Sequence, residues 1–156
     1  MSAHRLQESI GPGWVLVTDG GNGPLSQSLL DGRHQLIGDE PVAAGGRDLG
    51  PSPYELLLMS LGACTSMTLR LYANRKGWPL ARVIVRLRHE KVHATDCADC
   101  EDKQARLDRI DRYIEVAGEL DAAQRDRLLQ IAEMCPVHRT LTSRIEIHTR
   151  MAQTHS

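Results

Sequence analysis

Cys135 stands directly before a proline, among neighbours that can make a thiol reactive. If Pro136 is the first residue of a helix, Cys135 is its N-cap, and the unpaired amides and positive dipole end of that helix favour the thiolate. His138 and Arg139 follow within one turn and add positive potential. The alternative is a turn between two helices in which the cysteine has no reactive role. The segment therefore predicts either nucleophilic thiol chemistry or a simple turn.

Cys64 lies in an apolar segment, residues 61–67, that the pattern places inside a helix. A free cysteine there can be an inert packing residue, because cysteine is among the most frequently buried residue types. Gly62 favours a more specific role, since glycine costs about 1 kcal/mol in a helix interior and permits close approach of another backbone. Cys64 and Cys135 are so far apart in the sequence that only the tertiary fold could bring their sulfurs together.

A third group combines two histidines and two cysteines: His89, His93, Cys97 and Cys100. On a strand, His89 and His93 point to the same side because their spacing is even. Cys97 and Cys100 have the spacing of a zinc knuckle, so a zinc site with two cysteine and two histidine ligands is one interpretation. A redox-active Cys-x-x-Cys is a second interpretation, and a polar loop with exposed thiols is a third.

The composition limits which functions are expected. Among 156 residues, 19 are Lys or Arg and 20 are Asp or Glu, so a formal net charge of −1 gives no support to a broad nucleic-acid-binding or membrane-binding surface. Only 3% of the residues are aromatic and there is no Phe. Platforms for base stacking are therefore not expected, and the core must consist of aliphatic side chains.

The sequence also gives an expected location and domain count. No apolar run approaches the roughly 18–20 residues of a membrane span, and the N-terminus lacks the apolar core of a signal peptide. We therefore expect a cytoplasmic protein whose four cysteines are thiols or metal ligands. The length predicts one domain, residues 1–156, with flexible tails at 1–13 and 151–156.

The N-terminal part alternates turn signals with short apolar segments. Residues 14–18, 25–30 and 35–37 are predicted as strands of a small antiparallel meander. A glycine-rich linker, residues 45–50, follows. It leads to a predicted helix over residues 53–76.

That helix has strong signals at both ends. Ser52 can act as N-cap, with Pro53 at the first helical position. Gly77 and Pro79 end the helix by left-handed capping and by loss of an amide donor. The segment is apolar nearly all round through Leu61. It is therefore predicted as a central, buried helix.

The second half of the chain alternates strand and helix signals. They are, in order, a strand over 82–88, a strand over 110–116, a helix over 121–134, a short helix from Pro136 and a strand over 143–149. The strands are predicted from alternation of apolar and polar residues. Asp121 followed by Gln124 resembles a capping box and marks the start of the longer helix. The whole pattern predicts an α+β fold.

Four segments occur in the order found in a known family. They are Asp39-Glu40-Pro41, Gly50-Pro51-Ser52-Pro53-Tyr54-Glu55-Leu56-Leu57, Leu61-Gly62-Ala63-Cys64 and Cys135-Pro136-Val137-His138. The sequence resembles the OsmC/Ohr family of osmotically induced and organic-hydroperoxide-resistance proteins over residues 14–149. It is most similar to the less characterised OsmC-like branch.

The resemblance implies an α+β fold and an intertwined homodimer, with long central helices packed on each other between antiparallel sheets. It implies a thiol-dependent peroxidase of the oxidative stress response, in which Cys64 is peroxidatic and Cys135 resolves its sulfenic acid as a disulfide. A dithiol reductant as co-substrate then resets the enzyme, and no other cofactor is implied. We also expect an apolar pocket formed by Leu57, Leu61 and Met67.

The sequence departs from the family at the group that activates the thiolate. The family peroxidases place a Glu ten positions before the first cysteine, where it orients an Arg. Here Tyr54 stands at that position and Glu55 follows it. One helical step is about 100 degrees, so Glu55 faces a different direction. Arg33 and Arg47 are candidates for the family Arg, and Arg139 is a possible substitute.

Two other functions fit the sequence. A non-catalytic protein on the same scaffold would bind an apolar ligand or zinc, or would sense redox state through His93, Cys97 and Cys100. A purely structural dimer would carry inert thiols.

Overall fold

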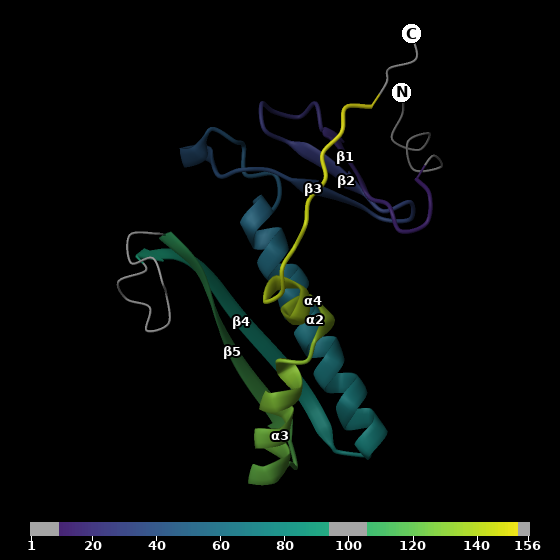
Figure 1. Ribbon diagram of the computed structural model, residues 1–156, viewed down its shortest axis with the longest axis vertical. Coiled ribbons are helices and arrows are strands. Elements are labelled where there is room, and N and C mark those ends of the chain that lie inside the picture. Colours follow the sequence, from purple (N-terminus) through teal and green to yellow (C-terminus); the bar gives the residue numbers. More distant parts are fainter. Residues whose placement is uncertain (1–9, 94–105, 153–156) are drawn as a thin grey trace. The chain divides into compact units, whose positions relative to one another are not determined.

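Figure 1 shows the computed structural model of the chain, which describes residues 10–93 and 106–152. The chain divides into two compact units, Met1–Met59 and Ser60–Ser156. Helix α2 (Pro53–Lys76) continues through the boundary between them. The predicted flexible tails lie mostly outside the described residues, and the single domain stays a prediction.

The first unit contains the predicted meander. Strands β1 (Leu16–Asp19), β2 (Gln27–Leu30) and β3 (Gln35–Gly38) form a three-stranded antiparallel sheet in chain order. Leu16 lies opposite Leu30, and Leu29 lies opposite Leu36. The meander prediction is confirmed, with β1 starting two residues later than expected. A short 3-10 helix, η1 (Val42–Ala44), follows β3.

The loop between β3 and α2 is organised around the buried carboxylate of Asp39, which is 2% exposed. Its oxygens accept the backbone N–H groups of Glu40 (2.9 Å), Arg47 (3.0 Å) and Leu49 (3.3 Å). Burial raises the pKa of Asp39, but these three amide donors outweigh burial and the pKa is lowered. The Asp39 N–H also donates to the Pro51 carbonyl, which fixes the chain where α2 begins.

Helix α2 has the predicted bounds because its end signals are local. The Glu55 carboxylate accepts the Ser52 backbone N–H (2.8 Å) and the Ser52 hydroxyl (2.9 Å), which satisfies donors at the N-terminus. At the other end Gly77 adopts φ 65°, a left-handed conformation that favours glycine. The N–H of Trp78 then bonds the Ala73 carbonyl and closes the last turn.

Burial of α2 follows one stripe of the helix. The buried residues recur every four positions: Leu61, Thr65, Leu69 and Ala73. Other apolar side chains are exposed, including Met59 (58%), Met67 (65%) and Leu71 (57%). The prediction of a helix buried all round is therefore wrong for the single chain. By length and composition α2 is long and apolar enough to cross a membrane, a property that core helices of soluble proteins share.

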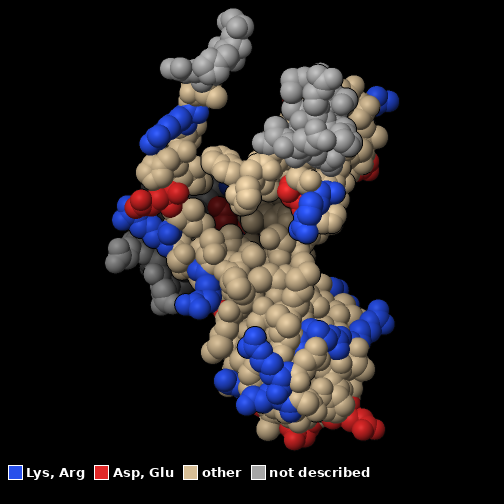
Figure 2. Space-filling model, turned by 90° about the vertical axis from the view of Figure 1, so that its right-hand side faces the viewer, with Lys and Arg blue, Asp and Glu red and all other residues tan. Residues whose placement is uncertain are grey.

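Basic side chains gather around the C-terminal end of α2, as Figure 2 shows on the second unit. Arg75 and Lys76 lie in the last turn, where positive charge favours the carbonyl end of the helix dipole. Lys76 and Arg127 lie over the ring of Tyr72, 5.9 and 5.7 Å from its centroid. These contacts stabilise the end of the helix.

The second unit is built on a long antiparallel hairpin, β4 (Leu80–His93) and β5 (Arg106–Gly118). Both strands extend beyond the predicted ranges because cross-strand ion pairs continue the pairing through polar residues. One is the pair between Lys91 and Asp108 (3.6 Å). Pairing between strands is a tertiary property. The alternation of apolar and polar residues therefore predicted only the middle of each strand.

Helices α3 (Ala122–Ala132) and α4 (Pro136–Leu141) follow the hairpin. The predicted capping box starts α3, with reciprocal bonds between Asp121 and Gln124. The core of the unit joins α2, the hairpin and α3 through Leu69, Ala73, Leu80, Leu120, Leu128, Ile131 and Ala132. One face of the hairpin packs on this core and sets the direction of β5 side chains.

The predicted closing strand is absent from the described chain. Residues 144–150 form no strand, and Ile145 and Ile147 are 52% and 85% exposed. A strand needs a hydrogen-bonding neighbour, and no described strand pairs with this segment. The prediction over 143–149 is therefore wrong for the single chain.

Candidate active site

Cys135 is placed at the N-terminus of α4 by the turn that ends α3. Its backbone is extended (φ −63°, ψ 141°), Pro136 begins the helix, and the Cys135 Sγ accepts the backbone N–H of His138 at 3.4 Å. The predicted N-cap is confirmed. The side chain is completely buried, so the sulfur depends on the protein for its hydrogen bonds.

A hydroxyl and a guanidinium lie close to the Cys135 sulfur. Thr65 of α2 places its Oγ1 3.7 Å from the Cys135 Sγ. The Nη1 of Arg112, on β5, donates to the Thr65 Oγ1 (3.0 Å) and to the Ala132 carbonyl (3.2 Å). Three elements, α2, β5 and the end of α3, therefore hold one cation beside one buried thiol.

The surroundings of Cys135 lower its pKa. Burial raises the pKa, but the His138 N–H, the Thr65 hydroxyl and the Cys64 thiol stabilise the thiolate through hydrogen bonds, and the Arg112 charge adds to them. The donors together outweigh burial. A thiolate is the nucleophilic form of cysteine, so this thiol is prepared for reaction.

The fold brings the two distant cysteines together. Cys64 lies one residue before Thr65 on α2, it is half-buried, and its thiol is within hydrogen-bonding reach of Cys135. Both are free thiols. The more accessible sulfur thus lies against the fully buried one, an arrangement that permits oxidation of the first and attack by the second.

A cavity of about 260 Å³ adjoins this cluster. Its lining combines apolar and polar side chains: Leu61, Asp108, Ile110, Arg112, His138, Leu141 and Thr142. Of the three residues predicted to form an apolar pocket, Leu61 lines this cavity, whereas Leu57 and Met67 are exposed by 36% and 65%. The cavity shares Arg112 and His138 with the surroundings of Cys135.

A family model described as OsmC-like protein matches residues 45–150. The chain belongs to the OsmC-like protein family. The predicted family is therefore confirmed. No curated protein matches the sequence.

Solved structures show the same fold. An osmotic stress induced and detoxification response protein from Psychrobacter arcticus 273-4 is 23% identical, with a TM-score of 0.65 over 83% of this chain and 88% of its own. An OsmC-like protein from Mycoplasma pneumoniae is 19% identical, with a TM-score of 0.63 over 82% and 85%. An organic hydroperoxide resistance protein OsmC from Legionella pneumophila is 20% identical, with a TM-score of 0.59 over 83% and 88%. The α+β OsmC-like fold with a long central helix is confirmed.

In this OsmC-like protein two residues around the thiols were missed by the sequence reasoning, Thr65 and Arg112. Arg112 carried a signal, because it lies in the same alternating phase as Ile110 and Ile114. A charged residue in the apolar phase of a strand needs a buried partner or a function. Thr65 carried no signal beyond its place beside Cys64.

The predicted supporting residues Glu55, Arg47 and Arg33 belong to the first unit. Glu55 caps α2, and hydrogen bonds from the Ser52 N–H and hydroxyl lower its pKa. The Arg47 guanidinium donates to the Asn22 carbonyl (2.7 Å), and Arg33 lies in an exposed turn. Their role toward the thiols stays a prediction.

Two further predicted supporting residues lie on helices. Tyr54 is half-exposed in the first turn of α2. Arg139 is exposed in the last turn of α4, where its backbone N–H donates to the Cys135 carbonyl (3.1 Å). Their roles also stay predictions.

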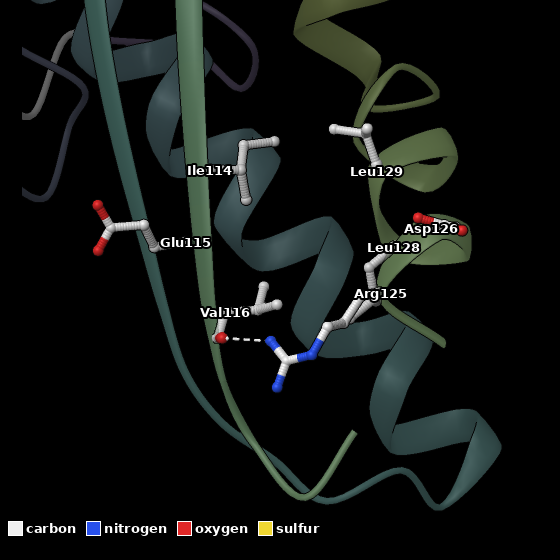
Figure 3. Close-up of a pocket in the computed structure, with 7 residues that line it drawn as sticks. All are labelled: Ile114, Glu115, Val116, Arg125, Asp126, Leu128 and Leu129. Atoms are coloured by element: carbon white, nitrogen blue, oxygen red, sulfur yellow. Dashed lines mark hydrogen bonds between the residues drawn. The ribbon is translucent and has the colours of Figure 1, made fainter. Parts of the chain in front are cut away.

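A larger cavity, about 540 Å³, lies between β5 and α3. Figure 3 shows its lining residues, with Arg125 reaching from α3 toward β5. The Arg125 guanidinium donates to the carbonyls of Val116 (2.8 Å) and Gly118 (3.3 Å). Arg125 therefore links α3 to the end of β5, and its guanidinium donors are bonded to backbone carbonyls of the fold.

The predicted zinc group falls largely outside the described residues. The side chain of His93 and all of Cys97 and Cys100 lie outside them. His89 is described, and its Nε2 lies 2.7 Å from a carboxylate oxygen of Asp108. Within residues 10–93 and 106–152, no group of three His, Cys, Asp or Glu side chains could hold a metal. Zinc binding stays a prediction.

Proposed function

We propose that this OsmC-like protein is a thiol-dependent reductase of organic hydroperoxides that acts in the oxidative stress response. The observation that carries the proposal is the position of the Cys64 thiol against the Cys135 sulfur, with Arg112 beside them. A nucleophile, a second thiol and a cation in one cluster are the groups that peroxide reduction through a disulfide needs. Membership of a family that includes organic hydroperoxide resistance proteins supports the same function.

The reaction proceeds in three steps. The Cys64 thiolate attacks the terminal oxygen of the hydroperoxide, the O–O bond breaks, and Cys64 becomes a sulfenic acid while the alkoxide leaves and takes a proton. The Cys135 thiolate then attacks the Cys64 sulfur and displaces hydroxide, which forms the disulfide. A dithiol reductant restores both thiols by exchange.

The cavity of about 260 Å³ supports an organic substrate. Leu61, Ile110 and Leu141 give it an apolar wall, which suits the hydrocarbon part of a hydroperoxide. Arg112 and His138 lie at the same cavity and provide donors for the peroxide oxygens.

The protein acts as a homodimer in the cytoplasm, in this proposal. The exposed apolar side chains of α2 need a cover, and a second copy of the same helix supplies one. The alternating segment with Ile145 and Ile147 needs a strand neighbour, which a dimer also offers. No metal cofactor takes part.

The test is turnover of cumene hydroperoxide with a dithiol, in a protein that also carries Cys97→Ser and Cys100→Ser. Only Cys64 and Cys135 then remain as thiols, and this double variant is the matched control. We expect Cys64→Ser to abolish turnover and Cys135→Ser to stop it after the first oxidation. Turnover by Cys64→Ser at the control rate would refute the assignment.

A further inference from the structure

We propose that Cys135 acts before it resolves the sulfenic acid: it takes the proton of the Cys64 thiol and returns that proton to the leaving alkoxide. This inference rests on the proposed function and assigns a catalytic acid–base role to the residue that the resemblance treats as the resolving thiol alone. Thr65 and Arg112 are the positioning residues of this step.

The contacts of Cys135 hold its sulfur in the unprotonated form that a base needs. The sulfur is completely buried and receives the His138 N–H at 3.4 Å. The Thr65 hydroxyl lies 3.7 Å from it, where either group can be the donor, and the Cys64 thiol is a further hydrogen-bond partner. A sulfur that meets donors on several sides is better satisfied as a thiolate than as a thiol.

The guanidinium of Arg112 can balance the negative charge of this thiolate. Both bonds of the Arg112 Nη1 go to uncharged oxygens, and no carboxylate among the described residues forms an ion pair with Arg112. Asp111, its neighbour on β5, is engaged by Arg88 (2.8 Å) and Arg109 (3.7 Å) instead. The Arg112 charge therefore remains for the sulfurs.

Thr65 can serve both protonation states of Cys135. Its hydroxyl accepts from Arg112 and has one hydrogen to give, which can go to the Leu61 carbonyl (2.8 Å) or to the Cys135 Sγ (3.7 Å). The hydrogen turns toward Cys135 when that sulfur is charged and toward Leu61 when it is protonated. A proton can thus arrive at Cys135 without leaving a buried polar group unsatisfied.

The proton of the Cys64 thiol passes to the Cys135 thiolate, and the Cys64 thiolate attacks the peroxide. The S–O bond forms, the O–O bond breaks, and the alkoxide takes the proton from Cys135. Cys135 is again a thiolate, and it attacks the Cys64 sulfur with release of hydroxide. The thiols lose two electrons, which the hydroperoxide gains.

The groups that face this proton transfer come from three elements. Cys64 and Thr65 are on α2, Arg112 is on β5, and His138 is on α4, with Asp108 at the adjoining cavity. The test variants change Cys135 and Thr65 and leave Cys64, Arg112, His138 and Asp108 in place.

The test measures the first oxidation of Cys64 in single turnover, with dimedone trapping of the sulfenic acid, in the Cys97→Ser/Cys100→Ser protein. The variants are Cys135→Ser and Cys135→Asp, since Asp is a favourable N-cap that can accept a proton but cannot form a disulfide. We expect Cys135→Ser to slow this oxidation about 100-fold at neutral pH and Cys135→Asp to restore much of the rate. Oxidation of Cys64 in Cys135→Ser at the control rate would overturn the inference, because a resolving role alone leaves this step unchanged.

Equally slow oxidation in Cys135→Ser and Cys135→Asp would also overturn it, since a base would then not be what is missing. A control protein that peroxide does not oxidise at Cys64 at all would refute the proposed function instead.

Thr65→Val and Thr65→Ser give an independent reading that leaves both thiols intact. We expect Thr65→Val to shift the pH–rate profile of Cys64 oxidation to higher pH and Thr65→Ser to restore it. An unchanged profile in Thr65→Val would count against the role of the hydroxyl.

Discussion

Asp39 and Cys135 are two buried acceptors, one in each unit of the chain, and the same physics lowers the pKa of both. In each case burial opposes ionisation and hydrogen-bond donors outweigh it. The donors differ in kind. Asp39 is held by three backbone N–H groups, whereas Cys135 has one backbone N–H and otherwise meets a hydroxyl, a thiol and a guanidinium charge.

The difference separates a structural anion from a reactive one. Backbone amides cannot turn away or give up their protons, so the charge of Asp39 fixes the loop that leads to α2. The side chains at Cys135 can rotate or lose a proton, so its charge can move. Burial and a lowered pKa alone therefore do not identify a reactive site. A reactive site also needs hydrogen-bond donors that can rotate or give up a proton.

The largest expected effect comes from removing the cation beside the thiols. Arg112→Met keeps most of the side-chain volume but loses the bonds to Thr65 and Ala132 and the positive charge. We expect the pKa of Cys135 to rise and turnover of organic hydroperoxide to fall about 100-fold. The ultraviolet absorbance of the thiolate against pH measures the first effect, and peroxide consumption measures the second.

Arg112→Lys is the matched variant, since it keeps the charge with a different donor geometry. We expect intermediate turnover. If Arg112→Met titrates and turns over like the unaltered protein, the cation has no part in activation.

The next effect concerns stability, because Asp39→Asn replaces one acceptor oxygen with an amide that faces backbone N–H donors. The folded pKa of Asp39 is lowered, so its carboxylate contributes stability that is present above the unfolded pKa of about 3.9 and is lost as pH falls through the folded value. We therefore expect the melting temperature of Asp39→Asn to lie below that of the unaltered protein at neutral pH, with a gap that narrows below about pH 4. A gap independent of pH would contradict the charged role of Asp39.

Cys135 should show the same linkage in the alkaline range. Its folded pKa is lowered, so the thiolate contributes stability that is present above the unfolded pKa of about 8.5 and is lost as pH falls through the folded value. We expect the melting temperature of the reduced protein, relative to Cys135→Ser, to increase as the pH rises toward the unfolded pKa and to level off above it. A difference in melting temperature that does not change with pH would show that folding stabilises no thiolate.

The smallest expected effect is on stability and concerns Asp121, the exposed N-cap residue of α3. Asp121→Ala removes the capping box of α3, and we expect a loss of about 1 kcal/mol in the free energy of unfolding, measured with denaturant. Turnover per folded molecule should stay unchanged, because Asp121 caps α3 and takes no part in the thiol chemistry. A loss of activity beyond the loss of folded protein would weaken the separation between structural and reactive acceptors.

Local signals made much of the fold predictable. Ser52 and Gly77 mark the ends of α2, and Asp121 and Pro136 mark the starts of the next two helices, because capping depends on residues within one turn. The closing strand was not predictable in this way. Its alternating pattern is present, but a strand exists only where another strand pairs with it.

The candidate site was predictable only in part. The N-cap position of Cys135 followed from Pro136, but the approach of Cys64 depends on how α2, β5 and α3 pack. Arg112 was visible as a charge in an apolar phase, yet its partners, Thr65 and the Ala132 carbonyl, are set by tertiary structure. The resemblance to the family instead predicted Arg33 or Arg47 as the activating residue.

The most direct test of the central claim is peptide mapping of the protein after treatment with substoichiometric organic hydroperoxide, without reductant. The account predicts a disulfide between Cys64 and Cys135, formed in proportion to the peroxide added and absent in Cys64→Ser. Peroxide-treated protein in which Cys135 stays a free thiol while Cys64 proceeds to sulfinic acid would contradict it.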